Sequence, residues 1–354
     1  MATFILNAWY VAAVSEDVSN DEPLGRKVCN FDIAFFRNAD GKIQAVEDFC
    51  PHRGAPLSLG KVVNGNLVCG YHGLQMAGSG NTHSMPKQRV DKFPCIRSFP
   101  VVEKFGFIWI WPGDPQKAAE EKLPNLQWAD NPDWAYGGGL FHIQCDYRLM
   151  IDNLMDLTHE TYVHASSIGQ KEIDEVPVQT TVEKGQVVTS RHMENISAPP
   201  FWQAALRAND LQDDGPIDRW QICRFDLPSH VMIEVGVAYA GKGGYDAPEN
   251  TKVGSWVVDF ITPETDSSIW YFWGMARNFK VDDPELTKSI RDGQGKIFTE
   301  DQEILERQQL NLDKYKDKRI LKLDIDAGGV QARRMIERAI KKEAELHLTG
   351  DLAQ

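Results

Sequence analysis

The chain has 354 residues, of which 42% are hydrophobic and 25% charged, and its formal net charge is −13. This length and composition suffice for two folded domains and exclude global disorder. The acidic balance argues against a nucleic-acid-binding protein, and no stretch has the about twenty uninterrupted apolar residues of a membrane-spanning helix.

The N-terminal and cysteine-containing segments indicate the cellular setting. Residues 1–17 lack a basic segment and look like a folded strand or turn, so we expect no signal peptide. Cys29, Cys95, Cys145 and Cys223 lie in apolar surroundings and are expected to be buried thiols. Together these features favour a reducing, cytoplasmic location.

The first part of the chain reads as β-rich, because short apolar runs alternate with turn residues at close spacing. Asn64-Gly65 between the runs KVV and NLV is a strong β-hairpin signal. A Pro-Gly-Asp-Pro turn and a polar stretch place a boundary near residues 114–124. We therefore expect one domain over residues 1–115 and a second over residues 116–354.

Two short cysteine–histidine segments flank that hairpin: Cys50 precedes His52 by two residues, and Cys69 precedes His72 by three. Two thiolates and two imidazoles are the ligand set of a Rieske [2Fe–2S] cluster, which carries one electron at a time. A zinc site with the same residues, or a disulfide between the cysteines, is an alternative. The pairing of each cysteine with a histidine in a loop rich in glycine and proline favours the cluster.

The second part reads as a helix, then strands, then helices. Residues 146–169 are predicted to be helical, strand-like runs follow between about 174 and 279, and the pattern from Pro284 onward is strongly helical. This order predicts an α+β fold: an all-β N-terminal domain, and a second domain with an antiparallel sheet around a long C-terminal helix.

A second group of ligand-type residues lies in the predicted helix. Asn153, Asp156 and His159 step by three and share one helical face. His164 follows His159 by five residues, about 140° further around a regular helix, so a helix break or π-bulge between them is needed for both to reach one metal. Alone, an Asp-x-x-His pair is often only a hydrogen-bonded surface pair. Two histidines and a carboxylate suit iron, so a third ligand must come from elsewhere.

The two Cys–His segments, followed by the run DNLMDLTHETYVH, resemble the oxygenase component of the Rieske non-haem iron oxygenases over essentially the whole chain. The resemblance implies that His159 and His164 bind a mononuclear Fe(II), and that the third ligand is an aspartate on the C-terminal helix. Asp301 fits that placement best, with Glu300 and Glu303 as neighbouring alternatives.

The resemblance also implies how electrons reach that iron. Asp156 would link His72 of one subunit to His159 of the next, in a head-to-tail homotrimer. Asn153 would support the metal site, or be a simple polar residue of the helix face. The chain has no dinucleotide fingerprint in a strand–helix setting, so NADH or NADPH would act only through a separate flavin/ferredoxin-type reductase.

The runs PHRGAPLSLG, CGYHGL and IWYFWGMARNF resemble the O-demethylating branch of this family. That likeness implies a monooxygenase of lignin-derived aromatic catabolism, which hydroxylates the methoxy carbon of vanillate with O2 and releases formaldehyde and protocatechuate. The alternatives are another methoxybenzoate, hydroxylation of an aromatic ring, a pure electron carrier, and a zinc-stapled binding module.

The sequence does not separate the residues of a substrate pocket, and core packing is the commoner role of each apolar candidate. The apolar candidates are Phe201, Trp202, Trp220, Val235, Trp256, Trp270 and Phe272. The candidates for a carboxylate-binding cation are Arg191, Arg207, Arg219 and Arg277.

Overall fold

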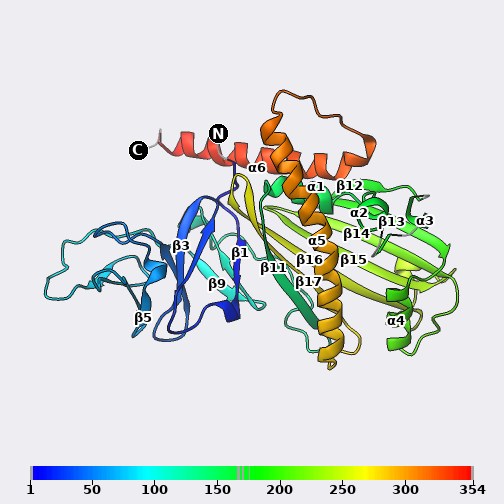
Figure 1. The fold of residues 1–354 in the computed structure, drawn as a ribbon, viewed down its shortest axis with the longest axis horizontal. Helices are drawn as coiled ribbons and strands as arrows, with labels where there is room; N and C mark the ends of the chain where they lie inside the picture. Colours follow the sequence, from blue (N-terminus) through cyan, green and yellow to red (C-terminus); the bar gives the residue numbers. More distant parts are fainter. Residues whose placement is uncertain (1–2, 166–167, 170, 175, 352–354) are drawn as a thin grey trace. The chain divides into compact units, whose positions relative to one another are not determined.

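The computed structural model describes residues 3–165, 168–169, 171–174 and 176–351 (Figure 1). The chain forms two compact units. The first is built from Met1–Asn125, Thr262–Asp266 and Glu343–Gln354, and the second from Leu126–Ile261 and Ser267–Lys342. The predicted α+β class is confirmed: the N-terminal unit is a β structure, and the other combines a large antiparallel sheet with helices.

Short strands in three antiparallel sheets form the first unit. The sheet orders are β1-β10-β9, β2-β3-β4 and β5-β6-β7-β8. The strands are β1 (Tyr10–Val14), β2 (Leu24–Val28), β3 (Phe31–Arg37), β4 (Ile43–Glu47), β5 (Lys61–Val63), β6 (Asn66–Val68), β7 (Gln75–Met76), β8 (Thr82–Ser84), β9 (Val101–Lys104) and β10 (Phe107–Ile110). Their inward side chains, among them Phe35, Phe36 and Trp109, are fully buried and give this unit its own core.

The predicted hairpin is confirmed between β5 and β6. Val63 pairs with Asn66, and Asn64 and Gly65 both have positive φ, at 49° and 73°. Positive φ at both central residues is the signature of a type I′ turn, whose twist matches that of the strands it joins. This hairpin is the short connection between the two Cys–His segments.

The second unit contains a seven-stranded antiparallel sheet in the order β11-β17-β16-β15-β14-β13-β12. The strands are β11 (Ala135–Ile143), β12 (Gln179–Glu183), β13 (Gln186–Ile196), β14 (Ile217–Asp226), β15 (His230–Tyr239), β16 (Lys252–Thr265) and β17 (Ser268–Arg277). The helices are α1 (Tyr147–Leu154), α2 (Glu160–Val163), α3 (Lys171–Asp174), α4 (Pro200–Ala208), α5 (Pro284–Lys314) and α6 (Ala327–Asp351).

Helix α5 lies across the sheet (Figure 1). Asp283 caps its first turn by accepting a hydrogen bond from the Leu286 N–H (2.9 Å), and a proline at the first helical position favours the same start. The Phe298 ring packs on Tyr271 and Trp273 of β17, with ring centroids 5.3 Å and 5.4 Å apart. This packing anchors the middle of α5, one turn before Asp301.

Two further expectations concern cysteines and membranes. Cys29, Cys145 and Cys223 are buried as predicted, but Cys95 is exposed, because it lies in the loop between β8 and β9. Among the described helices, none combines the length and the apolar content needed to cross a lipid bilayer.

Candidate metal centres

The two Cys–His loops of the first unit have matching backbone hydrogen bonds. In each loop the cysteine N–H donates to a carbonyl five residues on, and the N–H of a glycine four residues on donates to the cysteine carbonyl. The residues are Cys50, Gly54 and Ala55 in one loop and Cys69, Gly73 and Leu74 in the other, with donor–acceptor distances of 2.8 to 3.0 Å. Both glycines have positive φ, 70° and 77°, which a larger residue would strain.

The four cysteine and histidine side chains differ in exposure. Cys50 and Cys69 are each only 2% exposed, whereas His52 and His72 are exposed with ring centroids 4.6 Å apart. This donor set fits a Rieske cluster, with two thiolates for an inner iron and two imidazoles for an outer one. Exposed histidines are where an electron would enter or leave such a cluster.

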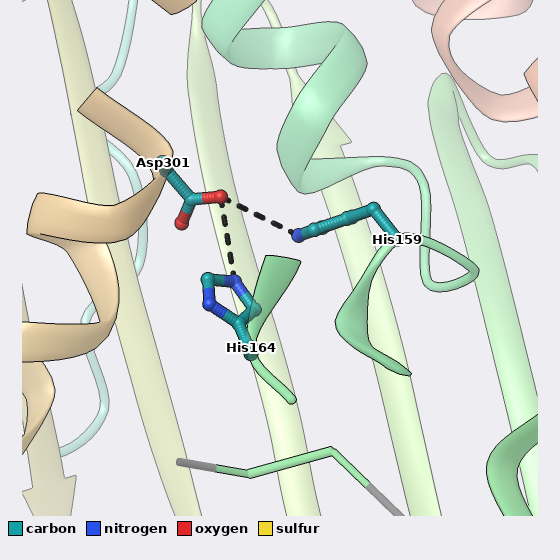
Figure 2. A group of neighbouring side chains, drawn as sticks. All are labelled: His159, His164 and Asp301. Atoms are coloured by element: carbon teal, nitrogen blue, oxygen red, sulfur yellow. Dashed lines mark ion pairs between the residues drawn. The ribbon is translucent and has the colours of Figure 1, made fainter. Parts of the chain in front are cut away.

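In the second unit, His159, His164 and Asp301 point toward one another (Figure 2). Asp301 Oδ1 lies 3.6 Å from His159 Nε2 and 3.3 Å from His164 Nε2. One ligand atom from each residue lies within 4.8 Å of the others. Metal–ligand bonds of about 2.0–2.2 Å fit this spacing, and two histidines with one carboxylate are a donor set typical of non-haem iron.

The helix predicted over residues 146–169 is interrupted, and the predicted place of the break was wrong. Helix α1 ends before the break and α2 is a single turn, with His159 at its N-cap and His164 at its C-cap. The helical conformation is therefore interrupted before His159 and not between the two histidines. The Asp156 carboxylate accepts from the N–H and the Oγ1 of Thr158, both at 2.7 Å, and such local bonds compete with a helix.

The outer nitrogen of each imidazole is held by the protein. His159 Nδ1 lies 2.6 Å from the main-chain carbonyl oxygen of Asp156, and His164 Nδ1 lies 2.7 Å from Glu300 Oε2. Both rings thereby present Nε2 to Asp301, which is how histidine ligands of metals are commonly oriented. Within the chain the carbonyl of Asp156, and not its carboxylate, makes the contact with His159.

The remaining predicted site residues also have defined positions. Asn153 Nδ2 donates to Asp301 Oδ1 at 2.9 Å, so Asn153 holds the carboxylate that faces the histidines. Glu303 is paired with Arg307 on the exposed face of α5, at 2.9 Å. Of the three carboxylates, Asp301 faces both histidines, whereas Glu300 contacts the outer nitrogen of the His164 ring.

Charge near His164 affects how easily it is protonated. Burial alone lowers the pKa of His164, but the hydrogen bonds and negative charges of Asp301 and Glu300 outweigh burial and raise that pKa. A metal ligand must be the neutral imidazole. Protons and a metal ion therefore compete for His164, and metal affinity falls as the pH is lowered.

A cavity of about 510 Å³ adjoins this group and is lined mainly by apolar side chains of α4, α5 and the sheet. Of the apolar candidates from the sequence, Phe201, Trp202 and Val235 line it, and Trp220, Trp256, Trp270 and Phe272 do not. Mostly apolar pockets with a few polar groups are typical binding sites for small molecules. The metal group lies in its wall, so a bound molecule would meet the metal.

The structure separates the four candidate arginines. Arg219 lines the cavity. Arg191 and Arg277 donate hydrogen bonds to main-chain carbonyl groups, and Arg207 is exposed and paired with Asp213.

Several polar residues of the cavity were not singled out from the sequence. Gln221 Nε2 donates to Glu160 Oε1 at 2.7 Å, a contact between residues 61 apart that no local pattern predicts. Gln294 lines the cavity from α5. Its spacing of seven residues from Asp301 places both on one helical face, and that spacing was a usable signal.

Asp259 is expected to make stability depend on pH. This fully buried carboxyl accepts from the Tyr271 O–H at 2.6 Å, and burial raises its pKa from 3.8 to about 8. Because folding raises the pKa of Asp259, the contribution of this carboxyl to the free energy of unfolding is fully present below about pH 3.8. It is lost as the pH rises through about 8.

The Asp259→Asn protein should therefore gain stability relative to the wild type between about pH 5 and about pH 8, by at most about 1.4 kcal/mol per pH unit. Thermal unfolding midpoints of both proteins across this range measure the difference. A difference that stays constant with pH would show that Asp259 is not protonated in the folded chain.

Two family models match successive parts of the chain. Residues 8–100 match the family model of the Rieske [2Fe-2S] domain, and residues 143–342 match that of the vanillate O-demethylase oxygenase C-terminal domain. The first match confirms the predicted [2Fe–2S] cluster in place of a zinc site.

Two relatives illustrate the likeness in sequence. The chain is 66% identical over 342 residues to the vanillate O-demethylase oxygenase subunit of Pseudomonas sp. (strain HR199), covering 97% of this chain and 96% of that protein. It is 35% identical over 349 residues to the oxygenase component of dicamba O-demethylase from Stenotrophomonas maltophilia, covering 97% and 99%.

Solved structures show the same likeness in fold. Dicamba monooxygenase bound to 3,6-dichlorosalicylic acid superposes with a TM-score of 0.88 at 35% identity, covering 97% of this chain and 99% of that one. Dicamba monooxygenase with non-heme iron and dicamba gives a TM-score of 0.82 at 34% identity, with the same coverage.

Proposed function

This chain belongs to the Rieske non-haem iron oxygenases that carry the vanillate O-demethylase oxygenase C-terminal domain, and we propose that it demethylates vanillate to protocatechuate. The observation that carries the proposal is 66% identity, over 97% of the chain, to a relative named for this reaction. The apolar cavity beside the His159, His164 and Asp301 group supports it, because such a cavity suits a single aromatic ring.

The proposed reaction balances as a monooxygenation. One oxygen atom of O2 enters a C–H bond of the methoxy group, and the other leaves as water after taking up two electrons and two protons. The resulting hemiacetal breaks its C–O bond to give formaldehyde and the phenol. The electrons come from a separate reductase, for which we propose the flavin/ferredoxin type.

We assign the electron-carrying part to residues 1–115. Cys50 and Cys69 would hold one iron of the cluster, and His52 and His72 the other. When bound, the cluster supplies one electron at a time. The matching loops keep the buried thiols fixed, and the exposed imidazoles leave one edge open to a partner.

We assign the chemistry to residues 116–354, with His159, His164 and Asp301 holding Fe(II). When bound, such an iron supplies the activation of dioxygen beside a C–H bond. The chain positions its own ligands: Glu300 orients the ring of His164, and Asn153 holds the Asp301 carboxylate. The cavity walls hold the methoxy group near the metal and keep water away.

The assembly and location are part of the same proposal. In a head-to-tail homotrimer in the cytoplasm, Asp156 would link His72 of one subunit to His159 of the next. A carboxylate that accepts a hydrogen bond from an imidazole fixes its tautomer and ring plane, which suits electron transfer between them.

Formaldehyde release tests the proposed reaction. The purified chain, a reductase and NADH are mixed with vanillate, and we expect formaldehyde, protocatechuate and consumed O2 in equal amounts. 4-Hydroxybenzoate, which has no methoxy group, is the control and should give no formaldehyde. Ring-hydroxylated products without formaldehyde would instead favour a ring hydroxylase, and no product from vanillate would reject the substrate assignment.

A further inference from the structure

The cavity beside the metal group has polar residues on the sheet and on α5 within a mostly apolar lining. Arg219 and Gln221 lie on the sheet wall, both on β14, and Gln294 lies on the helix wall, on α5. Apolar side chains such as Val257 and Phe298 form much of the remaining surface. A flat ring between the walls would have polar contacts with each of them.

Gln294 has an acceptor that needs a donor. Its side chain is only 7% exposed, and within the described part of the chain its Oε1 has no hydrogen-bond partner. An unpaired buried acceptor is unfavourable, so a ligand O–H that reached it would be bound selectively. Gln294 lies two helical turns before Asp301 on the same face, about 10.5 Å along the axis.

Arg219 places a buried guanidinium group in the wall of the cavity. It is 6% exposed, and the charged groups acting on it include Glu160 and Arg191. The Glu160 Oε1 atom accepts a hydrogen bond from Gln221, and it lies 3.9 Å from an Arg191 nitrogen. Burial lowers the pKa of Arg219, yet a guanidinium stays charged at neutral pH.

We infer that Arg219 binds the carboxylate of a 4-hydroxy-3-methoxybenzoate and that Gln294 accepts a hydrogen bond from its 4-hydroxyl group. The assignment rests on the proposed function, because it takes an aromatic acid to be the occupant of the cavity. Carboxylate and hydroxyl lie at opposite ends of the ring, as Arg219 and Gln294 lie on different walls. The methoxy group is next to the hydroxyl, so holding both ends determines which ring edge faces the metal group.

Three ligands separate the two contacts: vanillate, 3-methoxybenzoate without the hydroxyl, and guaiacol without the carboxylate. Dissociation constants are measured by anaerobic calorimetry on iron-loaded protein. Gln294→Leu should weaken vanillate binding about 10-fold and change 3-methoxybenzoate by less than about twofold. Arg219→Gln should weaken both acids about 30-fold and change guaiacol by less than about twofold, because a charge-assisted bond is lost.

Matched variants control for structural damage. Gln308→Leu, on the exposed face of α5, and Arg207→Gln, on the surface of α4, should leave all three dissociation constants unchanged. Arg219→Lys keeps the charge and should retain the preference for acids over guaiacol, which decides the matter if Arg219→Gln folds poorly. Lys296 also lines the cavity but is exposed.

Either of two results would overturn the inference. One is equal weakening of all three ligands by a Gln294 or an Arg219 variant. The other is a loss of acid binding in Lys296→Gln that Arg219→Gln does not show. Dissociation constants decide this inference, whereas formaldehyde release from vanillate decides the proposed function, so the two can fail separately.

Discussion

The Asp301→Ala protein is expected to contain about two irons per chain, one fewer than the wild type, and to release no formaldehyde from vanillate. Asp301 is the buried carboxylate that faces Nε2 of both His159 and His164. Without it, two neutral imidazoles remain, and affinity for a divalent iron falls sharply. Iron analysis and the electron paramagnetic resonance signal of the reduced cluster distinguish the two iron sites.

Variants of two neighbouring carboxylates test whether the loss of iron is specific to Asp301. Glu303→Ala, on the exposed face of α5, should keep the iron content and the activity of the wild type. Glu300→Gln should reduce activity by about 10-fold or more, because it disturbs the ring orientation of His164. Loss of iron in Glu303→Ala with retention of iron in Asp301→Ala would show that Glu303, and not Asp301, is the third ligand.

The Asp156→Asn protein is expected to keep both the cluster and the mononuclear iron, yet to lose at least about 100-fold in turnover. Asparagine retains an oxygen that accepts from Thr158 and the carbonyl that contacts His159, so the local fold should persist. It removes the negative charge proposed to join His72 of one subunit to His159 of the next. Formaldehyde release and iron content measure the two effects.

The hydrogen bond to Thr158 provides the control for Asp156. Thr158→Val removes the 2.7 Å contact from Oγ1 but leaves the carboxylate, and we expect turnover within about twofold of the wild type. Normal turnover in Asp156→Asn would contradict the proposed electron path. A large loss in Thr158→Val would instead show that the conformation of this loop, and not the charge of Asp156, governs turnover.

Local patterns predicted much of the fold. The hairpin at Asn64-Gly65 followed from residues that tolerate positive φ, and the α+β class followed from strand-like runs preceding a long helical pattern. The helix over residues 146–169 was predicted to break between His159 and His164, whereas it is interrupted before His159. A propensity pattern does not register that the Asp156 carboxylate bonds the N–H of Thr158 and interrupts the helix.

Local patterns likewise predicted some residues of the candidate sites but not others. Residue types and spacing singled out both Cys–His segments and the His159 and His164 pair, since few other side chains bind iron. Which polar residues line the cavity depends on which strands and helices meet there. Arg219 is one of four candidate arginines in the sequence, and only the arrangement of β14 against the cavity distinguishes it.

A single-turnover measurement tests whether this chain holds both the electron carrier and the oxygen-activating site. The iron-loaded chain is reduced without a reductase, freed of reductant, and mixed with vanillate and O2. We predict up to about one formaldehyde and one protocatechuate per chain, with oxidation of the cluster in the same turnover. Oxidation of the cluster with no formaldehyde, or formaldehyde while the cluster stays reduced, would contradict this account.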